Sequence, residues 1–153
     1  MKKYILLTFI LISNFSFACS CAELLPMKKA IQQADVVFTG KILSKESLTA
    51  KDGELSDYLK TQVKYKVLVT TMHKGKVKNK ILTVLTGPAS GGDCGYGFKI
   101  GSSYTIFTYT HPVIIKGKTV NKFLTTSICT RTQKFEKTEY NKIVKYCKSK
   151  GYC

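Results

Sequence analysis

The stretch Ala18-Cys19-Ser20-Cys21 decides the fold, because it sets two cysteines one residue apart near the start of the chain. Before it, two lysines precede an apolar run, which ends with small residues at the third and first positions before Cys19. This order is typical of a secretory signal peptide rather than of a buried helix. We therefore expect residues 1–18 to be removed, so that the mature chain begins at Cys19.

Removing those 18 residues leaves 135 of the 153, which suits one domain with a sizeable core over residues 19–153. No second long apolar segment follows, so we do not expect an integral membrane protein. The mature chain keeps 23 basic and 9 acidic residues, a net charge of +14. This charge attracts polyanionic sugars, anionic membrane surfaces or acidic proteins, although lysines spread along the whole sequence favour a plain solvated surface. Nucleic acid is a poor candidate partner for an exported chain.

An even number of cysteines in an oxidising compartment predicts a disulfide framework. All six lie in the mature chain: Cys19, Cys21, Cys94, Cys129, Cys147 and Cys153. The last two are close in sequence, so we expect a local Cys147–Cys153 bridge. A metal site is the rival interpretation, but no Cys-x-x-Cys motif or pair of histidines supports it. We therefore expect no metal of the protein's own and no cofactor.

The two N-terminal cysteines are too close together to pair comfortably with each other. Cys19 and Cys21 should instead reach Cys94 and Cys129, in either order, and we prefer Cys19–Cys94 with Cys21–Cys129. These bridges would close loops of 75 and 108 residues. On the chain-entropy model each could stabilise the fold by roughly 4–5 kcal/mol.

The segments between the cysteines are mostly strand-like. Val63, Tyr65, Val67 and Val69 alternate with polar residues, which predicts a half-buried strand. Further strands are expected over 35–43, with a bulge at Gly40, and over 81–86, 104–109 and 113–125, the last as a hairpin with its turn at 116–118. Residues 44–57 and 73–76 look like loop and turn. The glycine-rich residues 87–95 are expected to let Cys94 reach the N-terminus.

Two segments have helical spacing, one near each end of the mature chain. Pro26 precedes the first, whose apolar face is Met27, Ala30, Ile31 and Ala34. The second is expected to begin at Thr138 as N-cap with Glu139 in its first turn, and its apolar face is Tyr140, Ile143, Val144 and Cys147. Five or six strands flanked by two helices predict a mainly β, disulfide-stapled OB-type barrel, with a β-sandwich as the alternative.

Catalysis is not expected. The chain has two histidines, His73 and His111, in turn-like settings that favour surface positions. Neither has the spacing of a zinc site, and no nucleophile motif or phosphate-binding loop is present. The chemical feature is instead the α-amine that signal cleavage would free at Cys19. It titrates near 8, and with the carbonyl of the same residue it can chelate a metal ion that keeps an open coordination position.

Short motifs along the mature chain carry a resemblance to a known family. In order they are Cys19-x-Cys21, Val36-x-x-x-Gly40-Lys41-Ile42, Cys94-Gly95-Tyr96-x-Phe98, Gly101-x-x-Tyr104 and Leu124-x-x-Ser127-x-Cys129. This order resembles the netrin-type (NTR) domain, and specifically the N-terminal domain of the tissue inhibitors of metalloproteinases. The resemblance covers nearly the whole mature chain.

The resemblance implies an OB barrel with flanking helices, whose first two cysteines bond to Cys94 and Cys129. It also implies an inhibitor of zinc metalloendopeptidases, in which Cys19 chelates the protease zinc through its amino and carbonyl groups. Ser20 would enter the specificity pocket beside the zinc. Cys21 and the loop 90–95, with Asp93 and Cys94, would contact the target. We expect no counterpart of the second domain of the animal inhibitors, and Cys147–Cys153 would replace their third bridge in this domain.

A second hypothesis is a non-inhibitory NTR binding module, with or without a lipid on Cys19. Signal peptidase II also cleaves before a cysteine and leaves it acylated, which would block the amine and occupy the thiol. The residues before Cys19 lack the usual leucine at the third position, so simple cleavage is favoured. We thus expect a monomer in the extracellular space or the periplasm, and a membrane anchor if Cys19 is acylated. A third hypothesis is a basic protein that binds polyanionic sugars.

Overall fold

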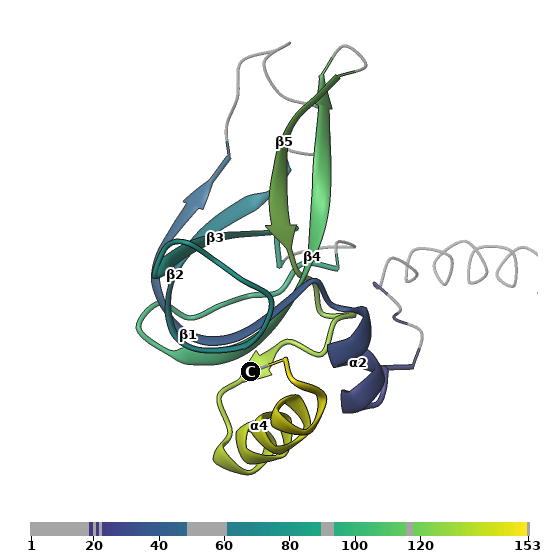
Figure 1. The fold of residues 1–153 in the computed structure, drawn as a ribbon. Coiled ribbons are helices and arrows are strands. Elements are labelled where there is room, and N and C mark those ends of the chain that lie inside the picture. Colours follow the sequence, from purple (N-terminus) through teal and green to yellow (C-terminus); the bar gives the residue numbers. More distant parts are fainter. Residues whose placement is uncertain are drawn as a thin grey trace, which may run out of the picture.

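In the computed structural model of the chain, strand β1 (Val36–Ser47) pairs along both of its edges, which closes the sheet into a barrel (Figure 1). The structure describes residues 19, 21, 23–48, 61–89, 94–115 and 118–152, so the expected signal peptide lies outside the described residues. The other elements, in chain order, are α2 (Met27–Gln33), β2 (Val63–Lys74), β3 (Ile81–Thr86), β4 (Ser103–Ile115), β5 (Lys118–Thr125), β6 (Gln133–Lys134) and α4 (Lys137–Lys150).

The barrel is closed by antiparallel pairs of β1 with β2 on one edge and with β4 on the other. At the middle of β1, Gly40 faces Val69 of β2 and Tyr104 of β4. The order around the barrel is β1-β2-β3-β5-β4, with a short parallel pair between β3 and β5, and β6 pairs with the start of β4. This confirms the expected OB-type barrel with a helix at each end, and the β-sandwich alternative is wrong.

Gly40 stands where β1 bends. The register with β2 shifts between Thr39 and Gly40, as the predicted bulge requires. A Cβ at this position would lie 2.7 Å from Cγ1 of Val67 and 2.8 Å from the carbonyl oxygen of Leu68. Only glycine lets β2 approach this closely, so the residue is fixed by packing.

Two hydrophobic clusters lie on opposite faces of the barrel wall. Along β1, Phe38 points into the barrel, while Val37 packs outside it, as the period of a strand requires. The inner cluster consists of Val36, Phe38, Ile42, Val63, Tyr65, Val67, Val84, Phe98, Tyr104 and Ile106. The outer cluster consists of Ala30, Ile31, Ala34, Val37, Phe107, Ile143 and Cys147. Both predicted helices therefore cover the outer wall with the apolar faces read from the sequence.

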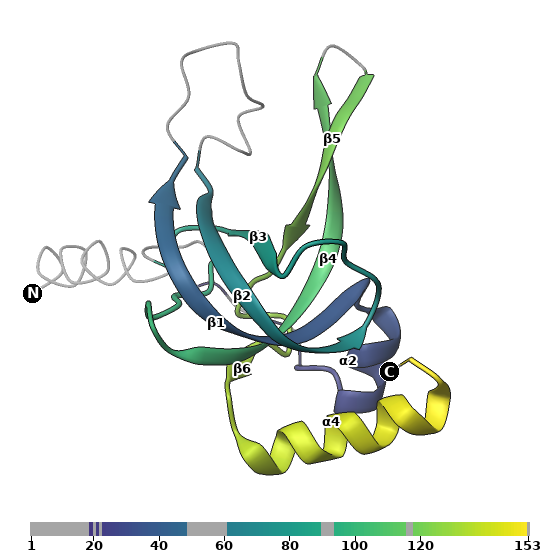
Figure 2. The ribbon, with the colours of Figure 1, turned by 60° about the vertical axis from the view of Figure 1, so that its left-hand side comes forward.

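The helices lie at one end of the molecule, and two long hairpins extend from the other (Figures 1 and 2). One hairpin is formed by β1 and β2, whose pairing continues to Ser47 opposite Val63. The expectation that residues 44–47 begin a loop is therefore wrong. These residues are exposed and polar, but they form strand because β2 supplies hydrogen-bond partners and Lys64 pairs with Glu46 at 2.7 Å.

The second hairpin corrects another boundary. Residues 103–115 form one strand, β4, rather than the two predicted strands over 104–109 and 113–115. Pro112 and the exposed His111 lie within it, opposite Lys122 and Phe123 of β5. The pairing of β4 with β1 reaches only Thr108, so at Pro112 the strand pairs with β5 along one edge. A proline is tolerated at such an edge position because its missing N–H is not needed for a second neighbour. His111 is thus at the surface as expected, but in a strand and not in a turn.

The C-terminal helix begins two residues earlier than expected. Helix α4 starts at Lys137 with Glu136 as its N-cap, so the prediction of Thr138 as N-cap is wrong. Glu139 is in the first turn as predicted, and Gly151, with φ of 70°, ends the helix in the left-handed conformation.

His73 is the clearest correction to the sequence analysis, because its side chain is completely buried. It belongs to β2, which continues to Lys74, and the turn begins only at Gly75, where φ is 91°. Its Nε2 lies 2.9 Å from the hydroxyl of Thr39, and its ring makes an edge contact with Tyr140 of α4. Burial lowers the pKa of His73 to about 4, so this residue is neutral in the folded protein at neutral pH.

Lys74 joins the barrel to the first helix. Its ammonium group donates hydrogen bonds to the carbonyl oxygens of Ile31, Gln32 and Ala34, at 2.9, 2.8 and 2.6 Å. These carbonyls belong to the end of α2 and to its C-cap, where intrahelical partners are lacking. One lysine therefore ends the helix and attaches it to β2.

We predict that His73 makes the protein less stable as the pH falls. Unfolded His73 takes up a proton near pH 6.5, whereas folded His73 does so only near 4. Between these values the unfolded state binds more protons, so the free energy of unfolding should fall by up to about 1 kcal/mol for each pH unit. Denaturant titrations at several pH values measure this slope.

The matched variants for that measurement are His73→Gln and His111→Gln. Glutamine at position 73 can keep a hydrogen bond to Thr39 but does not titrate, so the slope between pH 6.5 and 4 should become smaller. The His111→Gln variant, in which an exposed histidine is replaced, should keep the slope of the wild type. Equal slopes in the wild type and the His73→Gln variant would contradict the prediction.

Candidate functional site

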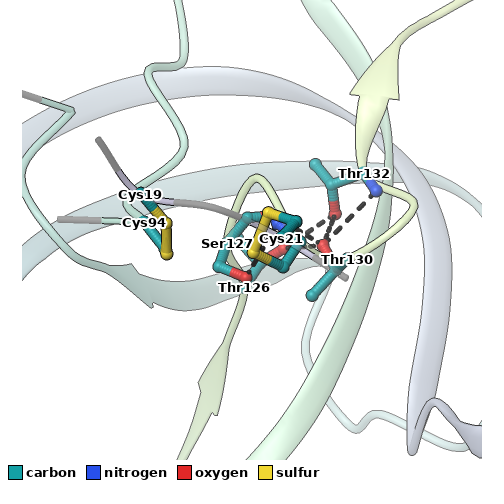
Figure 3. The surroundings of a disulfide bond; sticks show 8 residues. Cys19, Cys21, Cys94, Thr126, Ser127, Thr130 and Thr132 are labelled. Atoms are coloured by element: carbon teal, nitrogen blue, oxygen red, sulfur yellow. Dashed lines mark hydrogen bonds between the residues drawn. A yellow bond between two sulfur atoms is a disulfide. The ribbon is translucent and has the colours of Figure 1, made fainter. Parts of the chain in front are cut away.

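Two disulfides attach the N-terminal segment that contains Cys19 and Cys21 to the barrel (Figure 3). Cys19 bonds to Cys94, and Cys21 bonds to Cys129, with Cα–Cα distances of 5.3 and 5.2 Å. This is the order that we preferred from the sequence. Cys94 lies between β3 and β4, and Cys129 lies between β5 and β6, so the N-terminal segment is held across two connections that are far apart in the chain.

The four sulfur atoms of this cluster lie within 4.8 Å of one another, which is a spacing that could also hold a metal ion. Cysteine binds metals as the thiolate, and both sulfurs of each bridge are already committed to the S–S bond. The chemistry of these residues is therefore that of a covalent anchor. This anchor fixes the backbone of Cys19 and Cys21 on the barrel.

The connection between β3 and β4, which carries Cys94, is hydrogen-bonded to the connection between β5 and β6, which carries Cys129. The amide of Ile128 donates to the carbonyl oxygen of Cys94 at 2.9 Å. The amide of Thr126 donates to the carbonyl oxygen of Leu85 in β3 at 3.0 Å. Cys94 and Cys129 consequently belong to one hydrogen-bonded platform, and the N-terminal segment is attached to it at two points.

A cluster of threonine hydroxyls holds this platform on β4 (Figure 3). The hydroxyl of Thr126 lies 2.9 Å from that of Thr130 and 2.7 Å from that of Thr132. Thr126 donates to the carbonyl oxygen of Phe107 at 3.0 Å, and the amide of Phe107 donates to Thr132 at 2.9 Å. This cluster was not predicted from the sequence. Its only signal is the frequency of threonine in residues 125–132, Thr-Thr-Ser-Ile-Cys-Thr-Arg-Thr.

Gly95, next to Cys94, occupies a position that only glycine fits. The residue is buried, and a Cβ there would overlap the carbonyl oxygen of Gly87 and come within 2.7 Å of that of Pro88. The next amide, of Tyr96, donates to the hydroxyl of Thr86 at 2.7 Å. Cys94 thus reaches the N-terminal segment beside a close backbone contact of Gly95 with Gly87 and Pro88, while residues 90–93 of the predicted glycine-rich loop lie outside the described residues.

Arg131 links the N-terminal segment to the last helix. Its Nε and Nη2 atoms donate to one carboxylate oxygen of Glu139 at 3.0 and 2.8 Å, and Nη1 donates to the carbonyl oxygen of Leu25 at 3.3 Å. The charged hydrogen bonds are partly buried, where they are stronger than at an exposed surface. The sequence placed Glu139 correctly at the helix start but gave no indication of its partner.

Several predicted site residues cannot be placed. Ser20, Asp93 and Cys153 lie outside the described residues. The predicted Cys147–Cys153 bridge therefore stays a prediction. Cys147 itself is completely buried in the outer cluster, beside Ile143 of the same helix.

We predict that Gly95→Ala strongly destabilises the site. The added methyl group overlaps backbone atoms that cannot move aside without shifting Cys94, so we expect a loss of about 3 kcal/mol or more in the free energy of unfolding. Chemical denaturation measures the loss of stability. Mapping of the Cys19–Cys94 bridge after oxidative refolding shows whether Cys94 still reaches its partner.

Gly97→Ala is the matched control for this prediction. Its new Cβ would meet only the side chain of Ala89, at 3.1 Å, and that side chain is exposed. It should change the stability by less than about 1 kcal/mol. A Gly95→Ala protein as stable as the control would show that the close approach to Gly87 is not required.

In the part of the chain that the structure describes, no helix has the length and apolar character needed to cross a bilayer.

A comparison with curated proteins found no match. A family model, Tissue inhibitor of metalloproteinase, matches residues 17–147, which include the two N-terminal cysteines, the barrel and most of α4. Proteins of this family bind metalloproteinases as inhibitors and are not enzymes, and the family and the disulfides together indicate an extracellular protein. Because the match spans most of the sequence, this chain belongs to the tissue inhibitor of metalloproteinase family.

Proposed function

We propose that this protein is a secreted inhibitor of zinc metalloendopeptidases that chelates the zinc of its target through the amino and carbonyl groups of Cys19. The observation that carries the proposal is the pair of disulfides, which fixes Cys19 and Cys21 on the barrel at adjacent points. Removal of residues 1–18 by signal peptidase would turn the amide nitrogen of Cys19 into a free amine. The proposal therefore assigns two roles to this residue, a covalent anchor through its side chain and a metal ligand through its backbone.

The chemistry of an N-terminal amine suits this role. Its pKa is near 8, so at neutral pH part of the population is unprotonated and has a lone pair to donate. The amine nitrogen and the carbonyl oxygen of one residue form a five-membered chelate with a metal ion. A catalytic zinc with three protein ligands keeps a position open for water or substrate, and the chelate would occupy it.

Rigidity makes such a short ligand effective. A free N-terminus would lose conformational entropy on entering an active site, which would weaken binding. Here both Cys19 and Cys21 are already bonded to the platform, and Arg131 holds the carbonyl of Leu25 a few residues later. Most of that entropy has therefore been lost on folding.

The neighbours of Cys19 would complete the contact surface. In this proposal Ser20 enters the specificity pocket beside the zinc, and Cys21, Asp93 and Cys94 contact the protease around it. The half-buried Cys19, Cys21 and Cys94 belong to one cluster with the exposed Cys129. This grouping supports a continuous surface around the N-terminus.

One added residue tests the mechanism. Mature protein that carries an extra alanine before Cys19 has an amide in place of the amine, so it should inhibit a panel of zinc metalloendopeptidases at least about 100-fold more weakly, a loss of about 2.7 kcal/mol. Inhibition constants against the same enzymes give the result. The matched control carries the extra alanine after Cys153 and should inhibit like the unmodified protein.

Disulfide mapping and circular dichroism must first show that both extended proteins are folded. Undiminished inhibition by the protein with the N-terminal alanine would then overturn chelation through the Cys19 amine. If instead the unmodified protein inhibits none of the enzymes, the second hypothesis, a non-inhibitory NTR binding module, takes its place.

The disulfide of Cys19 also bears on how the chain is processed. Acylation by the lipoprotein pathway attaches a lipid to the cysteine sulfur, and that sulfur bonds to Cys94 in the structure. A lipid there would leave Cys94 without its partner and would block the amine. The bridge therefore supports simple cleavage after Ala18 and release of a soluble inhibitor, either outside the cell or in the periplasm.

The mass of the exported protein tests this processing. We expect a chain that begins at Cys19, with each disulfide lowering the mass by two hydrogen atoms. Thiol alkylation should label Cys19 and Cys94 only after reduction. A mass increased by acyl chains, with Cys94 alkylated before reduction, would contradict simple cleavage. Intact mass spectrometry of protein taken from the producing cell, before and after reduction, gives a clear answer.

A further inference from the structure

Helices α2 and α4 lie at the end of the molecule opposite the two long hairpins (Figures 1 and 2). Residues of both helices line a groove of about 280 Å³. Its lining consists of Met27, Lys28, Lys142, Lys145, Tyr146 and Ser149. The inhibitory role proposed above uses none of these residues. The groove is therefore a surface feature for which the fold and the proposed site give no reason.

Helix α4 presents the groove residues as a separate stripe. Lys142, Lys145, Tyr146 and Ser149 are spaced i, i+3, i+4, i+7, so they share one side of the helix. The neighbouring stripe contains the buried Ile143 and Cys147, which pack against the barrel. One side of α4 thus belongs to the core, and the adjacent side faces the groove.

The floor of the groove is apolar and its rim is cationic. Met27 and Tyr146 are partly buried and pack against the outer cluster. The lysines Lys28, Lys142 and Lys145 are exposed around them. A ligand that suits this arrangement carries negative charge next to an apolar part.

Acidic residues of the two helices do not neutralise this rim. Helix α2 contains two lysines and no acidic residue, and α4 contains five lysines and one acidic residue, Glu139. That carboxylate is buried and accepts two hydrogen bonds from Arg131. The helical end of the molecule therefore has a strong excess of positive charge, in a mature chain whose net charge is +14.

We infer that the α2–α4 groove docks the protein on a membrane surface that contains anionic phospholipid. Lysine clusters on amphipathic helices bind such surfaces, with about 1 kcal/mol for each lysine near the headgroups. The rim lysines would pair with lipid phosphates. The apolar floor would receive the first carbons below a headgroup, and Tyr146 has the amphipathic ring that is favoured at this depth.

A second cleft provides a matched control within the same molecule. It lies at the turn between β2 and β3, has a volume of about 470 Å³ and is also lined by three lysines, Lys76, Lys78 and Lys80. All three are exposed. Replacing them changes the net charge as much as replacing the three groove lysines, but it leaves both helices intact.

The experiment is co-sedimentation of the mature, unacylated protein with phosphatidylcholine vesicles, prepared with and without phosphatidylglycerol. Wild-type protein should bind only the anionic vesicles, and added salt should weaken binding. The triple variant Lys28→Gln, Lys142→Gln, Lys145→Gln should bind about 100-fold more weakly, since three lysines are lost. The control Lys76→Gln, Lys78→Gln, Lys80→Gln should lose less than about tenfold, because its lysines act only at long range.

Tyr146→Ser tests the apolar floor separately, and it should weaken vesicle binding without changing the net charge. Equal losses in the two triple variants would overturn the inference, because binding would then follow net charge alone. It would also be overturned if the wild type failed to bind the anionic vesicles. A third outcome is that the wild type binds no vesicles but is retained on a sulfated polysaccharide column, and that only the groove variant loses this retention. The ligand of the groove would then be a soluble polyanion and not a membrane. Inhibition assays on the same variants keep this test independent of the proposed function.

Discussion

The double attachment of the N-terminal segment is the constraint on which the rest of the structure depends. Cys19 and Cys21 are one residue apart, yet their partners are 75 and 108 residues away. Both partners can meet one short segment only if the connection after β3 and the connection after β5 lie at the same place. The parallel contact of β3 with β5 brings those two strand ends together, so barrel closure and disulfide formation require the same topology.

The platform under these disulfides is built from backbone contacts and small side chains. Gly95 lets the chain pass against Gly87, and the Thr126 hydroxyl group fixes the other connection on β4. From there the constraint extends to the helices, because Arg131 joins Leu25 to Glu139 at the start of α4. A change in any of these contacts would move the N-terminal segment, so together they hold Cys19 and Cys21 rigidly on the barrel.

Local sequence patterns predicted the parts of the fold that depend on neighbours in the chain. Alternation placed Val63, Tyr65 and Val67 inside the barrel, and helical spacing placed Ile143 and Cys147 in the outer cluster. Such patterns predict an element and its buried face, because both follow from the period of the backbone. Spacing also limited the partners of Cys19 and Cys21 to Cys94 and Cys129, because cysteines one residue apart do not pair comfortably with each other, but it left the order of the two bridges open.

The predictions that failed depend on partners that are distant in the chain. In the sequence His73 comes after the alternating residues 63–69 and before Lys74-Gly75, a setting that resembles a turn, but in the structure it belongs to β2, and its ring contacts Thr39 and Tyr140. The pairing of residues 44–47 depends on β2, and the position of Arg131 depends on Glu139 in the helix that follows. Local hydrophobicity does not indicate contacts with distant partners, so His73, a polar residue at the end of an apolar pattern, was predicted to lie at the surface.

The lysines of α2 and α4 are the part of this molecule that stability does not explain. Burial of apolar residues in two clusters, two disulfides and a few buried polar contacts account for the fold, and the lysines of α2 and α4 contribute to none of them. A high net charge of one sign opposes compact folding through self-repulsion. The closed barrel and its disulfides can tolerate that cost, and the cost is offset if the cations meet phosphates outside the protein. The disulfide end and the lysine-rich helical groove then have separate tasks, one set by covalent rigidity and the other by uncompensated charge.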